Sequence, residues 1–75
     1  MMAQIGDFVT ARLLGKKDCR QGMLVEIRCG VAIVQGMAEI YECEPEMTVV
    51  PDENIWLPTV AGWLEDERKR LGLIC

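Results

Sequence analysis

The sequence predicts a mainly β domain in which five short strands are followed by a C-terminal α-helix. Two observations support this prediction. Residues 22–36 contain two runs of β-branched and other apolar residues, with glycines at both ends and in the middle, as two strands joined by a turn require. Residues 58–71 have no proline after the first position and show the apolar spacing and charge order of a helix.

Residues 22–36 are expected to form a β-hairpin with a two-residue loop at Cys29-Gly30. The residues that then face each other are Arg28 and Val31, Ile27 and Ala32, and Val25 and Val34. A three-residue loop would shift this pairing without changing the alternation along each strand.

The alternation of side chains defines two faces of this hairpin. One face is wholly apolar and is expected to point into the core; it comprises Met23, Val25, Ile27, Ala32 and Val34. The other face combines charged residues with Leu24, Val31 and Ile33. Since a solvated face rarely carries three such residues, we expect the helix or a partner to cover it.

Three further strands are expected, over residues 8–13, 38–43 and 47–50. In the first of these strands the inward-facing side chains are predicted to be Val9, Ala11 and Leu13. Pro45 and Pro51 each interrupt a strand, because proline cannot donate a hydrogen bond within a central ladder. Residues 52–55 then fit a single 3₁₀ turn.

The helix is predicted over residues 58–71, with Pro58 in the first turn and Gly72 as the stop. Its apolar stripe consists of Val60, Leu64 and Leu71. We expect it to pack on the face with Leu24, Val31 and Ile33, or across an open end of the sheet. Trp56 is expected to be buried, while Trp63 fits the core and an interface equally well.

A chain of 75 residues forms one domain, here residues 1–75, with the strands over about residues 6–55. The four cysteines, Cys19, Cys29, Cys43 and Cys75, lack the close pairs that structural zinc prefers. With no secretory signal in view, we expect reduced thiols in the cytoplasm. No apolar run approaches the roughly 20 residues that span a membrane, and we expect no metal, cofactor or membrane association.

The arrangement of these elements resembles an SH3-like small barrel over residues 6–55. The segments that carry the resemblance are Gly6-Asp7-Phe8-Val9, the two runs of the hairpin, and Thr48-Val49-Val50-Pro51-Asp52-Glu53-Asn54-Ile55. Among such barrels, the KOW type binds RNA or proteins but is typically basic, whereas the pI of this chain is about 4.6. The type II dihydrofolate reductases share a Gly-Asp-x-Val entry, but Thr48-Val49-Val50-Pro51 stands where their catalytic Gln-Ile-Tyr motif lies.

Charge is segregated along the sequence. Residues 1–36 carry a net charge of +2, residues 37–57 of −6, and the remainder is neutral. The acidic residues that could form a recognition surface, rather than a solvated edge, are Glu39, Glu42, Glu44 and Glu46. The basic residues that could contact phosphate, rather than keep a loop soluble, are Lys16, Lys17 and Arg20.

We therefore predict a non-enzymatic, cytoplasmic protein-interaction module that binds itself or another protein. The chain has no histidine and no evident nucleophile–base pair, and we expect no small-molecule substrate. The predicted contact residues are Leu24, Val31, Ile33, Trp63, Leu73 and Ile74. The alternatives are a KOW-like nucleic-acid-binding barrel, which we do not favour, and an acidic inhibitor of a nucleic-acid-binding enzyme, as some phages encode.

Overall fold

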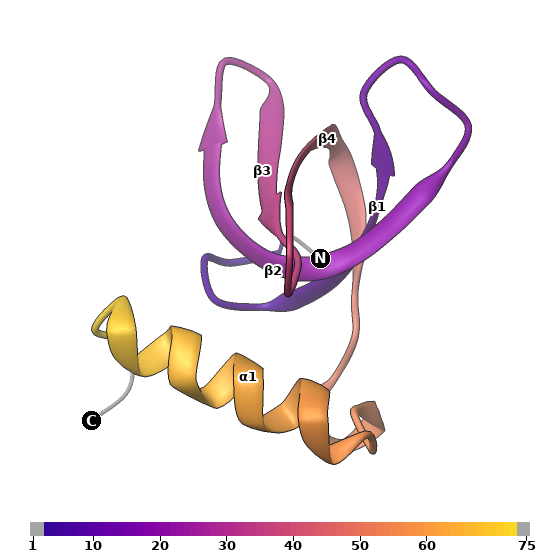
Figure 1. Ribbon diagram of the computed structural model, residues 1–75. Helices are drawn as coiled ribbons and strands as arrows, with labels where there is room; N and C mark the ends of the chain where they lie inside the picture. The colour runs from indigo at the N-terminus through magenta and orange to yellow at the C-terminus, as the bar shows by residue number, and fades with distance from the viewer. Residues whose placement is uncertain (1–2, 74–75) are drawn as a thin grey trace.

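The computed structural model describes residues 3–73 and shows four strands, a 3₁₀ turn and a C-terminal helix (Figure 1). The elements are β1 (Phe8–Leu13), β2 (Cys19–Arg28), β3 (Val31–Gln35), β4 (Ile40–Val49), η1 (Asp52–Asn54) and α1 (Pro58–Arg70). The predicted mainly β class with one C-terminal helix is confirmed. Within the described range, no helix has the length and apolar character needed to cross a membrane.

The four strands pair antiparallel in a closed order, β1–β2–β3–β4 and back to β1. Each of the two long strands, β2 and β4, pairs with one neighbour along its first part and with another along its second part, and this closes the ring. Residues 19–23 of β2 pair with β1 and residues 23–28 pair with β3. In β4, residues 40–43 pair with β3 and residues 43–49 pair with β1.

The structure has four strands where the sequence predicted five, because the segments 38–43 and 47–50 are two arms of β4. Pro45 lies where these arms meet. Ala11 of β1 pairs with Met47 of β4, and Leu13 pairs with Cys43. The segment of β4 between these two pairs is longer than that of β1, so β4 contains a bulge there. Such a bulge accommodates a residue without an N–H and bends the strand. The proline therefore bends β4 instead of ending it.

A second bulge, in β2, changes which hairpin residues reach the core. Arg28 and Ile27 pair with Val31 and Ala32 as predicted, but Val34 pairs with Leu24 instead of Val25. Ile27 keeps its predicted partner, but it lies next to the hairpin loop and is 45% exposed, so the prediction that it belongs to the core is wrong for a different reason. Leu24 is 0% exposed, so the prediction that it is on the surface is wrong because of the bulge. A one-residue bulge exchanges the two faces beyond it.

The loop of this hairpin has two residues, as expected. Cys29 and Gly30 both have positive φ, 51° and 77°. A two-residue loop with two positive φ values matches the right-handed twist of the flanking strands.

Two buried clusters hold the fold together. The first lies inside the ring and consists of Val9, Ala11, Leu24, Ala32, Val34 and Cys43. In the second, Leu64 of α1 packs on Phe8 and Met23. Helix α1 thus crosses the end of the ring where β1 begins and β4 ends (Figure 1). This is the second of the two expected positions, across an open end. The helix does not cover the face with Val31 and Ile33, which stay partly exposed, and Leu24 is internal.

Helix α1 ends at Arg70, one residue before the predicted boundary, and a Schellman motif follows. Gly72 N–H donates to the carbonyl of Lys69, and Leu73 N–H donates to that of Arg68. Gly72 has a φ of 75°, which the motif requires at this position. The motif turns the chain back, so that Leu73 lies over Gly6, where an added Cβ would be 2.7 Å from Leu73 Cδ1.

Candidate interaction surface

The outward side of β3 carries an apolar column between two carboxylates. Val31 and Ile33 are half-buried, and their outward position follows from the burial of Ala32 and Val34, which alternate with them along the strand. Across the sheet, Ile33 pairs with Glu26 of β2 and Glu42 of β4. Glu26 is engaged by Arg28 at 2.8 Å, whereas Glu42 takes part in none of the ion pairs found in residues 3–73.

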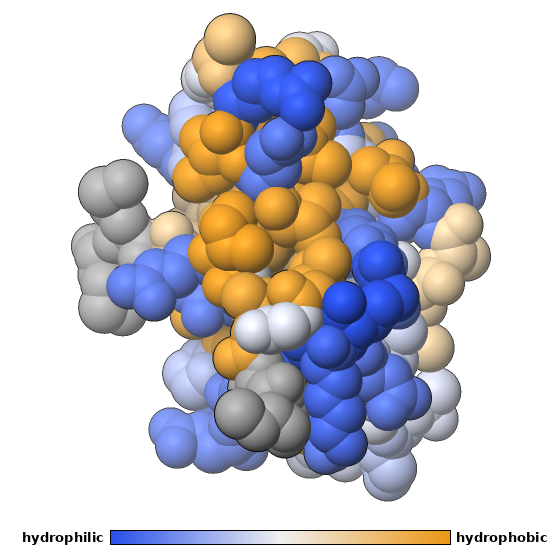
Figure 2. Space-filling model, turned by 90° about the vertical axis from the view of Figure 1, so that its left-hand side faces the viewer, coloured by the Kyte–Doolittle hydropathy of each residue, from blue (hydrophilic) through white to orange (hydrophobic). Residues whose placement is uncertain are grey.

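Figure 2 shows that hydrophobic residues form one continuous surface on the side where the β2–β3 hairpin stands above the C-terminal end of α1. Val31 and Ile33 share the outward side of β3 with Gln35, which hydrogen-bonds to Glu67 and Arg70 in the last turns of α1. The exposed Leu71 and Leu73 follow those turns, and Ile5 lies beside Leu73. We call the five apolar residues of this set, Ile5, Val31, Ile33, Leu71 and Leu73, the apolar face. Ile5 and Leu73 line one hollow with Gly6, so the N-terminal turn and the helix end are in contact there.

Glu67 and Gln35 fix the helix end to the sheet at the middle of this surface. The Gln35 amide donates to Glu67 Oε2 at 2.9 Å. Arg70 donates to the same carboxylate through Nε at 2.9 Å and through a second guanidinium nitrogen. The hydrogen bonds from Arg70, more than the one from Gln35, hold the pKa of Glu67 below its ordinary value, against the opposing effect of partial burial. The carboxylate is therefore charged at neutral pH.

The structure brings together only part of the predicted contact set. Val31, Ile33 and Leu73 belong to the apolar face. Trp63 is half-buried and packs on the second cluster, and Leu24 is fully internal, so its prediction as a contact residue is wrong. Ile74 lies outside the described residues.

The acidic residues do not form a single uniform surface. Glu42, Glu44 and Glu46 lie along β4, while Glu39 is in the turn before that strand. Glu44 lies 3.7 Å from Arg12 and accepts a long hydrogen bond from Gly15 N–H. The charge segregation of the sequence is thus partly cancelled in space, because β1 and its loop pair with β4.

The basic residues Lys16, Lys17 and Arg20 are all exposed, in the loop between β1 and β2 and at the start of β2. Arg20 lies over the ring of Tyr41, 6.0 Å from its centroid, a distance at the limit of a cation–π contact. Its guanidinium also donates to the carbonyl of Cys19. The contact with Tyr41 therefore directs the Arg20 side chain toward β4.

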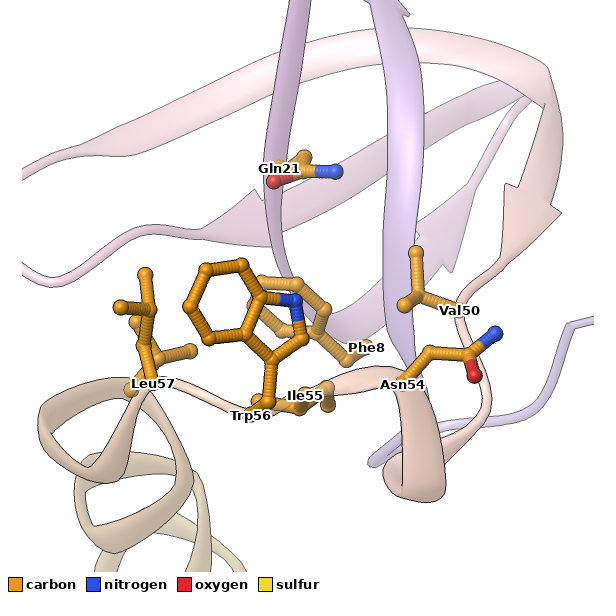
Figure 3. A pocket seen from close by; sticks show the side chains of 8 residues that line it. Phe8, Gln21, Val50, Asn54, Ile55, Trp56 and Leu57 are labelled. Carbon is orange, nitrogen blue, oxygen red and sulfur yellow. The ribbon is translucent and has the colours of Figure 1, made fainter.

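The prediction for Trp56 is also wrong. Its side chain is 80% exposed, although burial was predicted. It lines an open groove of about 230 Å³ together with Phe8, Gln21, Val50, Asn54, Ile55, Leu57 and Val60 (Figure 3). Pro51 and Pro58 flank this segment, in which Ile55 packs on the second cluster while Trp56 points away from it. The two prolines were the one signal in the sequence that could have suggested exposure.

The cysteines show no common site within the described residues. Cys19 and Cys29 are exposed and Cys43 is buried. Burial raises the pKa of the Cys43 thiol above its ordinary value, and this outweighs the opposite effect of Arg20. Residues 3–73 contain no cluster of three or more potential metal ligands.

Comparison with known proteins gives no relative: no family model, no curated protein and no solved structure matches this chain.

Proposed function

We propose that this chain is a small, non-enzymatic protein-interaction module that acts in the cytoplasm by binding a second copy of itself or another protein. The observation that supports this most is the distribution of apolar side chains. Among the described residues, nine hydrophobic side chains are buried and nine large ones are exposed. Exposed apolar patches beyond a few hundred Å² are uncommon on monomers, so a partner that covers part of this surface explains the sequence best.

The proposed architecture is an SH3-like barrel. Its support is the closed pairing order of four antiparallel strands, the division of β2 and β4 between two neighbours, and the 3₁₀ turn after the last strand. Many unrelated functions use this architecture, so the functional proposal rests on the surface.

Affinity capture with the full chain tests the function. The wild type should retain a protein in stoichiometric amount, whether a second copy or a host protein, and Ile33→Glu should lose it because a carboxylate in the apolar column cannot be desolvated cheaply. Thr59→Glu, an exposed change in the first turn of α1, is the control and should retain the partner. If the wild type retained no protein in this experiment, the result would contradict the proposal.

A second candidate is presentation of the acidic strand to a basic protein. It is supported by the exposure of Glu42 and Glu46 on β4. Binding of this kind should weaken steeply with salt and should be lost in a Glu42→Gln, Glu46→Gln variant, whereas association through the apolar face should persist at high salt. Direct nucleic-acid binding would instead require Lys16 and Lys17, and a double alanine variant tests that reading in a mobility-shift assay.

A further inference from the structure

We propose that the apolar face is a two-fold symmetric interface between two copies of this chain, in which the hairpin of each copy covers the C-terminal end of α1 of the other. The inference rests on the proposed function and deepens it by naming the partner and the orientation. In a two-fold interface both copies use the same surface. If the hairpin end of the first copy contacts the helix end of the second, the hairpin end of the second also contacts the helix end of the first.

The apolar residues are placed as this symmetry requires. Val31 and Ile33 lie at the hairpin end of the face, and Leu71 and Leu73 lie at the helix end. Gln35, two residues after Ile33 on the same side of β3, connects the two ends through its hydrogen bonds with Glu67 and Arg70. A two-fold axis near Gln35 therefore brings the apolar residues at the hairpin end of one copy against those at the helix end of the other, with the Gln35–Glu67–Arg70 cluster close to the axis.

The hairpin end has one carboxylate, that of Glu42, without an ion pair among the described residues, and the last turn of α1 is basic. Glu26 and Glu42 flank the column at the hairpin end, and basic residues fill the last turn of α1. Arg70 lies on the sheet side of that turn, where its guanidinium also reaches Gln35 Oε1 at 3.4 Å. The two-fold arrangement brings Arg70 of one copy toward Glu42 of the other, and complementary charges of this kind fix orientation and register.

The two ends of the surface are also held in a fixed relationship before association. Arg68 joins α1 to the N-terminal turn through the carbonyl of Gly6 at 2.9 Å, and Gln35 joins it to β3 through Glu67. Because the surface is already ordered, little conformational entropy is lost on binding. The Trp56 groove lies at the other end of α1, so it provides a control outside the proposed interface.

Sedimentation velocity of the purified full chain tests the proposal. The wild type should sediment as a dimer at micromolar concentration. Glu42→Arg and Arg70→Glu should each weaken association about tenfold or more, and the double variant should recover most of the loss because the opposite charges face each other again. Glu46→Arg and Trp56→Ala should sediment like the wild type. Circular dichroism checks that each variant is folded.

A wild type that is monomeric throughout this range would overturn the proposal, and a host protein recovered by capture would still support the function. A double variant as weak as the weaker single variant would also overturn it.

Cross-linking supplies a test that does not depend on the charge variants. In a Cys19→Ser, Cys75→Ser background, Lys69→Cys should form an intermolecular disulfide with Cys29 at the tip of the hairpin under mild oxidation. Adding Cys29→Ser should abolish the covalent dimer. A dimer that cross-links equally well without Cys29, or not at all, would show that the copies are oriented differently and would overturn the two-fold arrangement.

Discussion

Arg68 of α1 and Asp52 of η1 form a bidentate ion pair, with guanidinium–carboxylate distances of 2.7 and 3.0 Å. The same guanidinium donates its Nε–H to the carbonyl of Gly6. One side chain thus connects the helix, the 3₁₀ turn and the N-terminal turn. The Arg68 side chain is only 18% exposed, while that of Asp52 is 66% exposed. Removing the arginine should therefore destabilise the fold more than removing the carboxylate.

Arg68→Ala should lower the free energy of unfolding by about 2 kcal/mol, because three hydrogen bonds from a charged donor are lost. Asp52→Asn should cost only about 1 kcal/mol, since that carboxylate is largely solvated. Urea unfolding followed by circular dichroism measures both. Lys69→Ala removes an exposed pair with Glu65 and should change the stability by less than about 0.5 kcal/mol. Equal losses for all three variants would show that Arg68 has no special role.

Stability should fall as the pH drops through the acid range. Hydrogen bonds from Arg68 and Arg70 lower the pKa values of Asp52 and Glu67 below their ordinary values of 3.8 and 4.5. A carboxyl with a lowered pKa in the folded state stabilises the fold fully above its unfolded pKa, and this contribution is lost as the pH falls through the folded value. The stability should therefore be flat near neutral pH and decline below about pH 4.5.

Unfolding midpoints between neutral pH and pH 2.5 test this prediction. The Asp52→Asn, Glu67→Gln variant should be less stable at neutral pH and should lose less on acidification. A variant whose acid dependence parallels that of the wild type would place the responsible carboxyls elsewhere.

Gly22 and Gly62 should respond to alanine in opposite directions. A Cβ on Gly22 would lie 2.4 Å from the carbonyl oxygen of Gln35, so the β2–β3 pairing would have to shift. We expect Gly22→Ala to cost about 3 kcal/mol or more, as overpacking against backbone does. Gly62 is within α1 and faces open space, so Gly62→Ala should stabilise the protein by about 0.5–1 kcal/mol. Thermal unfolding of both variants distinguishes steric conflict from a general effect of alanine.

Leu24 and Ile27 test the bulge in β2. Leu24→Ala should cost about 2–5 kcal/mol, because it leaves a cavity inside the ring. Ile27→Ala should cost less than about 1 kcal/mol, since that side chain is already largely in water. Regular alternation without the bulge predicts the reverse order. Denaturant unfolding measures both losses, and a loss below about 1 kcal/mol for Leu24→Ala would refute the bulge, because Leu24 would then face the solvent.

The sequence by itself determined the elements that depend on local chemistry. The Cys29-Gly30 loop, the pairing of Arg28 with Val31, and the inward set of Val9 and Ala11 follow from alternation and turn geometry, and all are found. The helix bounds agree within one residue, because Pro58 and Gly72 act on their own neighbours.

The tertiary structure decided the rest. Closing four strands into a ring requires β2 and β4 to bend and to change partners, and each does so through a bulge. Pro45 marks the bulge in β4, but the bulge in β2 has no comparable signature in the sequence. The bulge in β2 buried Leu24, and the bend in β4 merged two predicted strands at Pro45. Ile27 kept its predicted partner Ala32 but is exposed next to the hairpin loop. Helix α1 packs on Phe8 and Met23 because these point outward where the ring ends. That placement leaves Val31 and Ile33 uncovered and puts Trp56 in solvent, since which apolar residues remain exposed depends on how distant segments meet.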